Sequence, residues 1–266
     1  MPNPLRPIGR LIPADARGRL PRLGGPVAAR PAAAARAVRA AVASWHPVDA
    51  LVVRGSAVRG TWVDGASDLD VVMLSDTPWP DDVEDRLHAD GTVEAARDGL
   101  ALDAVCLTFE ELHADPRARG LRFHLALCAT TLWGRDVLSD LPEPRLGPDA
   151  MVHLPGVESW HRTWARESAA PLDPDEARIL CAWMAKRLVR SAFEGVMMEI
   201  GAYTRDLHPA AEAVAGRRPA LGAPIRAAAA FAVSHRGDVA ALDALVRRTM
   251  PALLEMRDAA PGRHTD

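Results

Sequence analysis

The sequence predicts an α+β protein, in which an N-terminal α/β domain precedes a C-terminal α-helical bundle. Apolar runs of strand length lie at residues 49–54, at 69–74 and near 92–107. The segment 141–148 is rich in proline and ends in Gly-Pro, as interdomain linkers often do. Strand-like runs stop beyond this linker, and helix signals replace them. The expected parts are an N-terminal arm (1–30), a first domain (31–140) and a helical domain (150–260).

The first domain also carries helix signals between its strands. Residues 31–45 are rich in alanine, which favours a helix, and His-Pro at 46–47 ends it. Prolines followed by acidic residues favour a second helix within 78–87. A strand or hairpin is then expected near 92–107, and another helical stretch begins at 110–112.

Three helices are expected in the C-terminal domain. Residues 173–176 read Asp-Pro-Asp-Glu, which places a cap, a proline and acidic side chains at a helix start. This helix should run to the Glu-Ile-Gly of 199–201. A second helix is expected over 224–236, with Pro at its first position. A third is expected over 238–248, capped by its aspartate and interrupted by Pro251.

The residues with the clearest chemistry lie around the first two strands. Gly55-Ser56 ends the first apolar run, and Asp68 and Asp70 open the second. Alternate residues of a strand point to the same face, so the two aspartates should project together while Leu69 faces the core. Neighbouring carboxylates repel each other unless a cation lies between them, and Mg²⁺ prefers such oxygen ligands. Gly55 lets backbone amides approach a phosphate, and Ser56 can donate its hydroxyl.

This pattern resembles the nucleotidyltransferase superfamily, the fold shared by DNA polymerase beta and the aminoglycoside nucleotidyltransferases. Eleven residues separate Ser56 from Asp68, which suits the loop of that family. The resemblance implies a nucleotidyltransferase domain with a short mixed sheet, and the layout is closest to small-molecule nucleotidyltransferases with a C-terminal helical domain. A plain turn between hairpin strands would explain Gly55-Ser56. It would not explain two aspartates that open a buried strand, because unpaired buried charge is costly.

The family adds a third carboxylate on a later strand, and Asp103 is the matching residue. Side chains alternate along a strand, so Asp103 should point to the face opposite Leu102 and Ala104. The resemblance implies that Asp68 and Asp70 bridge two Mg²⁺ ions, while Asp103 ligates the catalytic ion and can act as general base. Glutamates of the helical domain, at positions 194 and 199, are alternative bases. The implied nucleotide-binding residues are Gly55, Ser56, Arg59, Ser67, Lys186, Arg190 and Tyr203.

Lys186 is the only lysine of the chain. On a helix it shares a stripe with Arg190 and Glu194, because the three are spaced by four residues. In one interpretation, Lys186 and Arg190 bind the triphosphate from the side opposite the aspartates. In the other they form a solvated face, with an Arg190–Glu194 pair worth a few tenths of a kcal/mol. Tyr203, the only tyrosine, can stack on a base, hold a substrate hydroxyl or simply follow a helix end.

The composition of the chain limits the kinds of molecule that it is expected to bind. The net charge of −3 and the absence of a lysine-rich tract weaken a nucleic acid backbone as the main partner. No apolar run approaches the ~20 residues that span a bilayer. The cysteines at 106, 128 and 181 are far apart in apolar segments, which favours buried thiols and a cytoplasmic location.

The resemblance therefore implies Mg²⁺-dependent transfer of a nucleoside monophosphate, AMP from ATP, to a hydroxyl of a small molecule. An antibiotic or a biosynthetic intermediate would suit, and pyrophosphate would leave. The alternative is a protein-modifying adenylyltransferase of the antitoxin type, although such relatives usually consist of the α/β domain alone. A nucleotide-binding regulator would have lost the acidic residues. The acceptor, the nucleotide base, the general base and the oligomeric state stay open.

Overall fold

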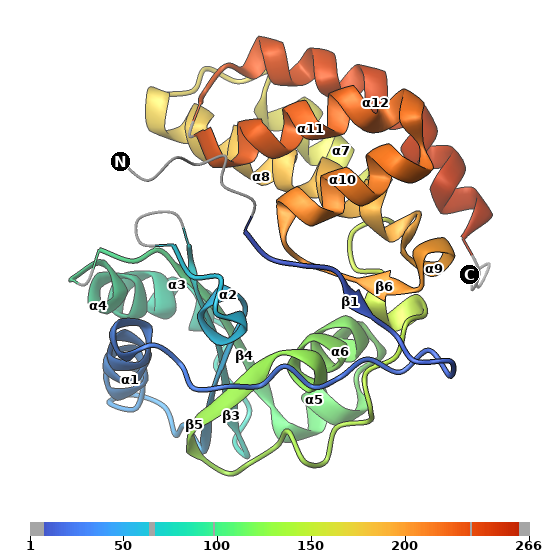
Figure 1. Ribbon diagram of the computed structural model, residues 1–266. Coiled ribbons are helices and arrows are strands. Elements are labelled where there is room, and N and C mark those ends of the chain that lie inside the picture. The colour runs from blue at the N-terminus through green and yellow to red at the C-terminus, as the bar shows by residue number, and fades with distance from the viewer. Residues whose placement is uncertain (1–7, 64–66, 98, 235, 261–266) are drawn as a thin grey trace. The chain divides into compact units, whose positions relative to one another are not determined.

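The computed structural model describes residues 8–63, 67–97, 99–234 and 236–260 of the chain. Its contacts divide the chain into two compact units (Figure 1). The sheet unit consists of Leu20–Pro144, and the helical unit combines the N-terminal segment up to Arg19 with the chain after Pro144. The predicted α+β class, with a sheet domain followed by helices, is confirmed.

Four strands form the sheet of the first unit, in the spatial order β4-β3-β2-β5. The central strand β2 runs antiparallel to β3 and β5, and β3 runs parallel to β4, so the sheet is mixed. The predicted first and second strands are thereby confirmed, whereas β5 was not among the predicted strands. The strands are β2 (Ala50–Arg54), β3 (Leu69–Ser75), β4 (Leu102–Thr108) and β5 (Ala129–Gly134).

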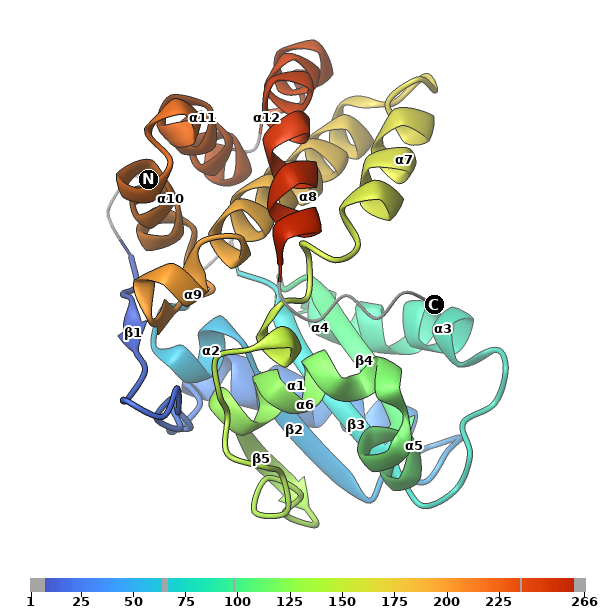
Figure 2. The same ribbon diagram turned by 90° about the vertical axis from the view of Figure 1, so that its right-hand side faces the viewer.

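Helices cover both faces of this sheet (Figures 1 and 2). On one face, β2 and β3 pack against α5 (Phe109–Ala114) and α6 (Arg119–Leu127) in a cluster that includes Val52 and Val72. On the other face, α1 (Ala29–Val42) buries Ala34, Ala35 and Val38. Two covered faces explain why β2 and β3 read as nearly continuous apolar runs.

The segment before β4 corrects the prediction of a strand or hairpin near 92–107. Its first part is helical, and only residues from Leu102 onward form the strand. Packing against α1 explains the difference, because Ala95 is fully buried there and Gly91 lies close to Val38. The helical elements are α2 (Ser56–Arg59), α3 (Val83–Arg86), a π-turn (Leu87–Gly91) and α4 (Thr92–Arg97).

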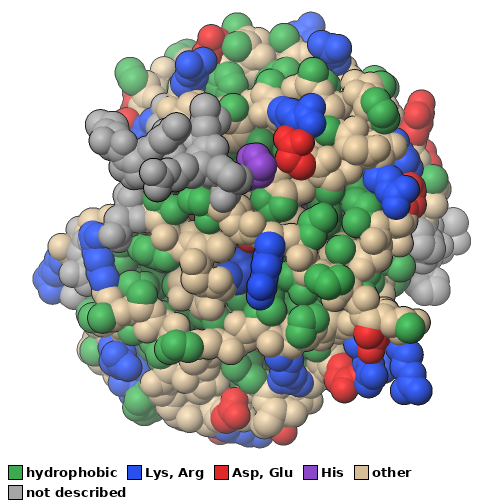
Figure 3. All heavy atoms as spheres, viewed as in Figure 1, with side chains coloured by type: hydrophobic (Ala, Val, Ile, Leu, Met, Phe, Trp, Pro, Cys, Tyr) green, Lys and Arg blue, Asp and Glu red, His purple; other side chains and the backbone are tan. Residues whose placement is uncertain are grey.

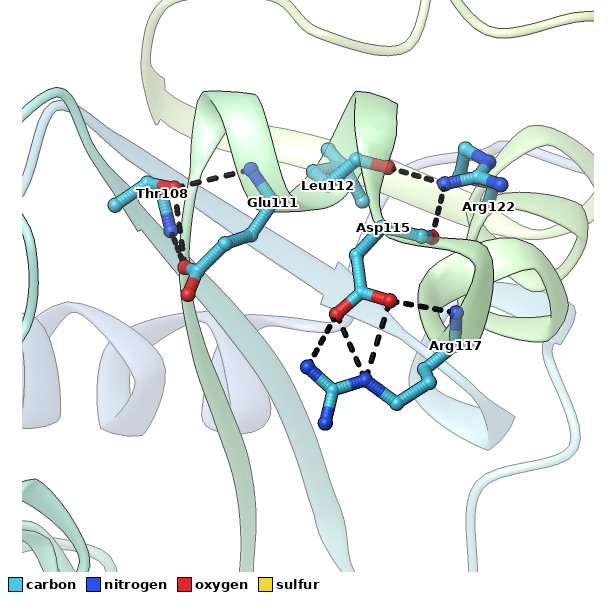
Figure 4. A network of polar contacts seen from close by, with 6 residues as sticks. All are labelled: Thr108, Glu111, Leu112, Asp115, Arg117 and Arg122. Carbon is cyan, nitrogen blue, oxygen red and sulfur yellow. Dashed lines mark hydrogen bonds and ion pairs between the residues drawn. The ribbon is translucent and has the colours of Figure 1, made fainter.

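A capping box fixes the passage from β4 into α5 (Figure 4). The Glu111 amide donates to Thr108 Oγ1 over 3.0 Å, and the Thr108 amide donates to the Glu111 carboxylate over 2.7 Å. Arg122 of α6 then donates to the carbonyls of Leu112 and Asp115, which ties the two helices together. Asp103 lies near the start of β4, and these contacts fix the other end of that strand.

In the helical unit, the long helix α8 contacts five other helices. Its N-terminus confirms the prediction, because the Asp173 side chain accepts from the amides of Asp175 and Glu176 in a capping box. The helices are α7 (Val157–Glu167), α8 (Pro174–Glu194), α9 (Met197–Ile200), α10 (Leu207–Arg217), α11 (Pro219–Ser234) and α12 (Val239–Ala259).

Three helix boundaries differ from the prediction. The helix expected to reach 199–201 divides into α8 and α9 at Gly195, where a β-carbon would lie 2.6 Å from the sulfur of Met256. The absence of a side chain at Gly195 therefore allows α12 to pack closely against this point. The helix expected from Pro224 starts earlier, at Pro219, which takes the favoured first position. α12 continues past Pro251 because burial of Met250 and Leu253 compensates for the missing hydrogen bond.

The N-terminal segment belongs to the helical unit. Strand β1 (Ile12–Pro13) pairs antiparallel with β6 (Ala202–Tyr203), and the Ala14 amide donates to the Gly201 carbonyl over 2.9 Å. Residues 8–19, which the sequence places in an N-terminal arm, are thus held by a partner strand far along the chain. Composition gives no sign of such a long-range pairing.

The surface shows how the charge is spread. On the face drawn in Figure 3, lysine and arginine side chains are scattered among hydrophobic ones. Across the described ranges, every helix is too short or too polar to cross a membrane.

Candidate functional site

Two of the predicted acidic residues meet at one end of the sheet. Asp70 is the second residue of β3, Asp103 is the second residue of β4, and the parallel register pairs them directly. Partners in such a register point to the same face of a sheet. Asp68 lies just before β3 and is exposed. The structure therefore brings Asp70 and Asp103 together and leaves Asp68 beside them at the strand entrance.

A single cation joins the two paired carboxylates. Arg54 is the last residue of β2, and its Nη1 lies 3.3 Å from Asp70 Oδ1. Its Nη2 donates to Asp103 Oδ2 over 3.0 Å. The Arg54 side chain is 13% exposed, against 21% for Asp70 and 55% for Asp103. The guanidinium thus spans three strands and compensates two neighbouring negative charges.

Gly55 makes the approach of Asp70 possible. Its φ of 78° lies in the left-handed region, and it begins α2 directly after β2. A β-carbon at this position would lie 2.1 Å from Asp70 Oδ2. The sequence assigned Gly55 to a phosphate contact, and the structure adds that it leaves room for a carboxylate.

The other predicted nucleotide-binding residues of the sheet unit flank this point. Ser56 and Arg59 are the first and last residues of α2, and both are half-buried. The Ser67 hydroxyl accepts from the Val63 amide over 3.0 Å, while the Ser67 amide donates to the Val63 carbonyl. Ser67 therefore closes the loop between α2 and β3, whose residues 64–66 lie outside the described ranges.

The donor set of the site fits a divalent cation in its chemistry. Among the described residues, no three His, Cys, Asp or Glu side chains are already arranged as metal ligands. Asp70 and Asp103 nevertheless offer hard carboxylate oxygens to one shared positive charge. Asp68 adds an exposed carboxylate two residues from Asp70.

The predicted stripe on α8 is only partly a surface. Lys186 and Arg190 are half-buried, but Glu194 is buried and faces His153. The Glu194 carboxylate accepts from the amides of His153 and Leu154 over 2.8 and 2.7 Å. His153 Nδ1 lies 3.1 Å from its other oxygen. These contacts engage both oxygens of the Glu194 carboxylate in the interior of the helical unit.

The two buried groups have shifted pKa values. Burial lowers the pKa of His153 to about 4, more than the contact with Glu194 raises it. Burial raises the pKa of Glu194, but hydrogen bonds from His153 and Leu154 outweigh this effect, so that the pKa lies below its usual value. At neutral pH the pair is therefore an ionised carboxylate that accepts from a neutral imidazole. The sequence analysis did not single out His153.

Tyr203 corrects the prediction of a base-stacking side chain. It is 2% exposed, its strand pairs with β1, and its ring meets that of Phe193 edge to face at 6.5 Å. The aromatic ring of Tyr203 is therefore part of the packed interior of the helical unit. Glu199, the other alternative base, is ion-paired with Arg218.

Arg54 is the residue of the candidate site that sequence reasoning missed. The only signal was an arginine at the end of an apolar strand, directly before Gly55. An arginine there can equally point to solvent, so only the strand order β4-β3-β2 reveals that it reaches both aspartates.

Comparison with known proteins shows which sequence family the segment around this site matches. Residues 35–128 match the sequence family described as nucleotidyltransferase domain, a range that includes Gly55 and all three aspartates. No protein of curated function is detectably similar in sequence. The fold is similar to the crystal structure of spectinomycin adenyltransferase AAD(9) from Enterococcus faecialis with ATP and spectinomycin. That likeness has a TM-score of 0.55 and 12% identity, and covers 85% of this chain and 98% of the other.

Proposed function

Since the chain contains a nucleotidyltransferase domain at residues 35–128, and so is a transferase, we propose that it transfers AMP from ATP to a hydroxyl of a small molecule. The observation that carries the proposal is the direct pairing of Asp70 with Asp103 beside Gly55. Similarity in fold to AAD(9), whose structure contains ATP and spectinomycin, supports ATP as donor and an antibiotic-like acceptor.

Asp68, Asp70 and Asp103 would hold magnesium in this proposal. When bound, magnesium supplies positive charge that stabilises the attacking and leaving oxygens of the phosphoryl group. The paired register keeps Asp70 and Asp103 on adjacent strands, so their oxygens need little movement to share a cation. Rigid strands suit this task because catalytic groups must be held precisely.

The transfer forms a bond between the acceptor oxygen and the α-phosphorus and breaks the bond from that phosphorus to pyrophosphate. The acceptor hydroxyl loses its proton in the process. We assign the proton to the Asp103 carboxylate, which is 55% exposed and reachable by a substrate. Glu194 is unsuitable, because its oxygens already accept three hydrogen bonds.

Each unit is proposed to contribute nucleotide-binding residues. Gly55, Ser56, Arg59 and Ser67 offer backbone amides, hydroxyls and a guanidinium around the first turn of α2. In the helical unit, the half-buried cations Lys186 and Arg190 of α8 are proposed to bind phosphate oxygens.

The test is a transfer assay with Mg²⁺ and ATP labelled in its α-phosphate, offered spectinomycin, other hydroxyl-rich antibiotics and protein extracts. Mass spectrometry should find an AMP adduct on a small molecule, absent with Asp70→Asn. Label that appears only on a protein would support the antitoxin-type alternative and contradict the small acceptor. Parallel reactions with the other nucleoside triphosphates test the preference for ATP.

A further inference from the structure

We infer that Arg54 is an exchangeable counter-ion, which occupies Asp70 and Asp103 until a divalent cation displaces it. The inference rests on the proposed function, because it assumes that these carboxylates bind the metal. It assigns a positioning role to Arg54, which goes beyond what the family match and the similarity in fold imply.

The geometry places one guanidinium between two carboxylates. Arg54 Nη1 and Nη2 reach Asp70 Oδ1 and Asp103 Oδ2 over 3.3 and 3.0 Å. These are oxygens that a metal shared by the two aspartates would use. Arginine stays protonated in proteins, so the guanidinium cannot escape competition by losing its charge. A divalent cation that binds both aspartates would therefore compete with the Arg54 guanidinium for the same two negative charges.

Exposure indicates which contact breaks first. Asp103 is 55% exposed, so water screens and can replace its pairing with Arg54. Asp70 is 21% exposed and is confined by the close backbone of Gly55. We therefore expect Arg54 to leave Asp103 while it keeps its contact with Asp70.

The pairing also leaves Arg54 incompletely satisfied. Its Nε is buried and has no hydrogen-bond acceptor among the residues that the structure describes. An unused buried donor costs free energy, which reduces the net stabilisation that the pairing provides.

Without Arg54, the two aligned carboxylates should repel each other more and attract a cation more strongly. A neighbouring positive charge offsets the repulsion between two carboxylates and competes with any other cation for them. Removal of this competitor should therefore raise the affinity for a divalent cation by on the order of tenfold. The same removal should lower the stability of the metal-free protein.

Titration with Mn²⁺, followed by electron paramagnetic resonance without nucleotide, tests this inference. Arg54→Gln should bind Mn²⁺ about tenfold more tightly than wild type, melt at a lower temperature in chelator, and gain more stability from Mn²⁺. Arg117→Gln is the matched control, because it removes a highly exposed arginine that pairs with one carboxylate, Asp115, in the same unit. Arg54→Lys keeps the charge and provides a second, more conservative variant.

The outcomes separate the two proposals. If Asp70→Asn abolishes Mn²⁺ binding while Arg54→Gln and Arg54→Lys bind it like wild type, the metal site stands and the counter-ion role is wrong. If wild type and every variant fail to bind Mn²⁺, both the proposed metal site and the role of Arg54 are refuted. Intermediate affinity of Arg54→Lys supports competition, since an ammonium cannot bridge both carboxylates in the same fork geometry.

Discussion

The carboxylate of Asp70 occupies the space where a side chain of residue 55 would start. A β-carbon on Gly55 would come within 2.1 Å of Asp70 Oδ2, and φ of 78° disfavours other residues independently. One glycine therefore solves two problems, the sharp turn from β2 into α2 and the position of a proposed metal ligand. The Gly-Ser of the sequence motif and its Asp-x-Asp are thus parts of one contact.

Gly55→Ala should accordingly impair the enzyme more than backbone strain alone predicts. The left-handed conformation costs a non-glycine residue ~1–2 kcal/mol, and the contact with Asp70 adds to it. Gly60→Ala is the control, because Gly60 has a φ of 72° but no described atom within 4 Å of the point that a β-carbon would occupy. Urea unfolding and transfer rates should both rank Gly55→Ala as more damaging. Equal effects would contradict a specific role of the Asp70 contact.

Asp70→Asn and Asp68→Asn should abolish nucleotide transfer and leave the fold intact. Loss of a metal ligand should cost several kcal/mol in the transition state, so less than about a tenth of the rate should remain. Asp115→Asn is a matched control, because it changes a carboxylate that pairs with the highly exposed Arg117. Rates and circular dichroism spectra are compared. A variant at Asp70 that keeps more than about a tenth of the activity would contradict the assignment.

His153 should make the helical unit sensitive to mild acid. Its pKa of about 4 in the folded protein lies below the ordinary value of 6.5, so the unfolded chain binds a proton more readily. This contribution to stability is complete above pH 6.5 and is lost as the pH falls toward 4, and Glu194, whose pKa is also lowered, acts in the same direction below that range. The full effect of His153 is on the order of 3 kcal/mol.

His153→Asn tests this pH dependence, since an asparagine amide can still donate to Glu194. Unfolding by urea at about pH 7 and about pH 5 should show a smaller loss of stability for the variant than for wild type. The exposed His113→Asn, in the other unit, should behave like wild type. An unchanged pH dependence in His153→Asn would mean that other groups carry the acid sensitivity.

The sequence predicts the fold best where local pattern and tertiary contacts agree. The two central strands and the capped start of α8 depend on hydrophobic runs and on Asp173, and both were found as predicted. The strand or hairpin near 92–107 was partly wrong because burial of Ala95 against α1 favours a helix there. The pairing of β1 with β6 joins distant segments, which no local pattern reveals.

The candidate site divides in the same way. The alternation of side chains along the strand predicted that Asp103 points to the face opposite Leu102 and Ala104. The exposed side chain of Asp103 agrees with this prediction. Arg54 escaped notice because its partners are set by strand order rather than by spacing. One of the two interpretations of the α8 stripe placed Glu194 on a solvated face, whereas the loop amides of His153 and Leu154 bind it in the interior.

Lys186→Ala should weaken the binding of ATP far more than it lowers stability. Lys186 is the only lysine and lies half-buried on α8, where a compact ammonium can bind a phosphate oxygen. Such a charge-assisted contact is worth ~1.5–3 kcal/mol, about a ten- to hundredfold change in affinity. Calorimetry with a non-hydrolysable ATP analogue and Mg²⁺ measures it, beside melting curves. Arg178→Ala, on the same helix and paired with Asp175, is the control. Unchanged affinity in Lys186→Ala would remove this cation from nucleotide binding and make acceptor binding its better assignment.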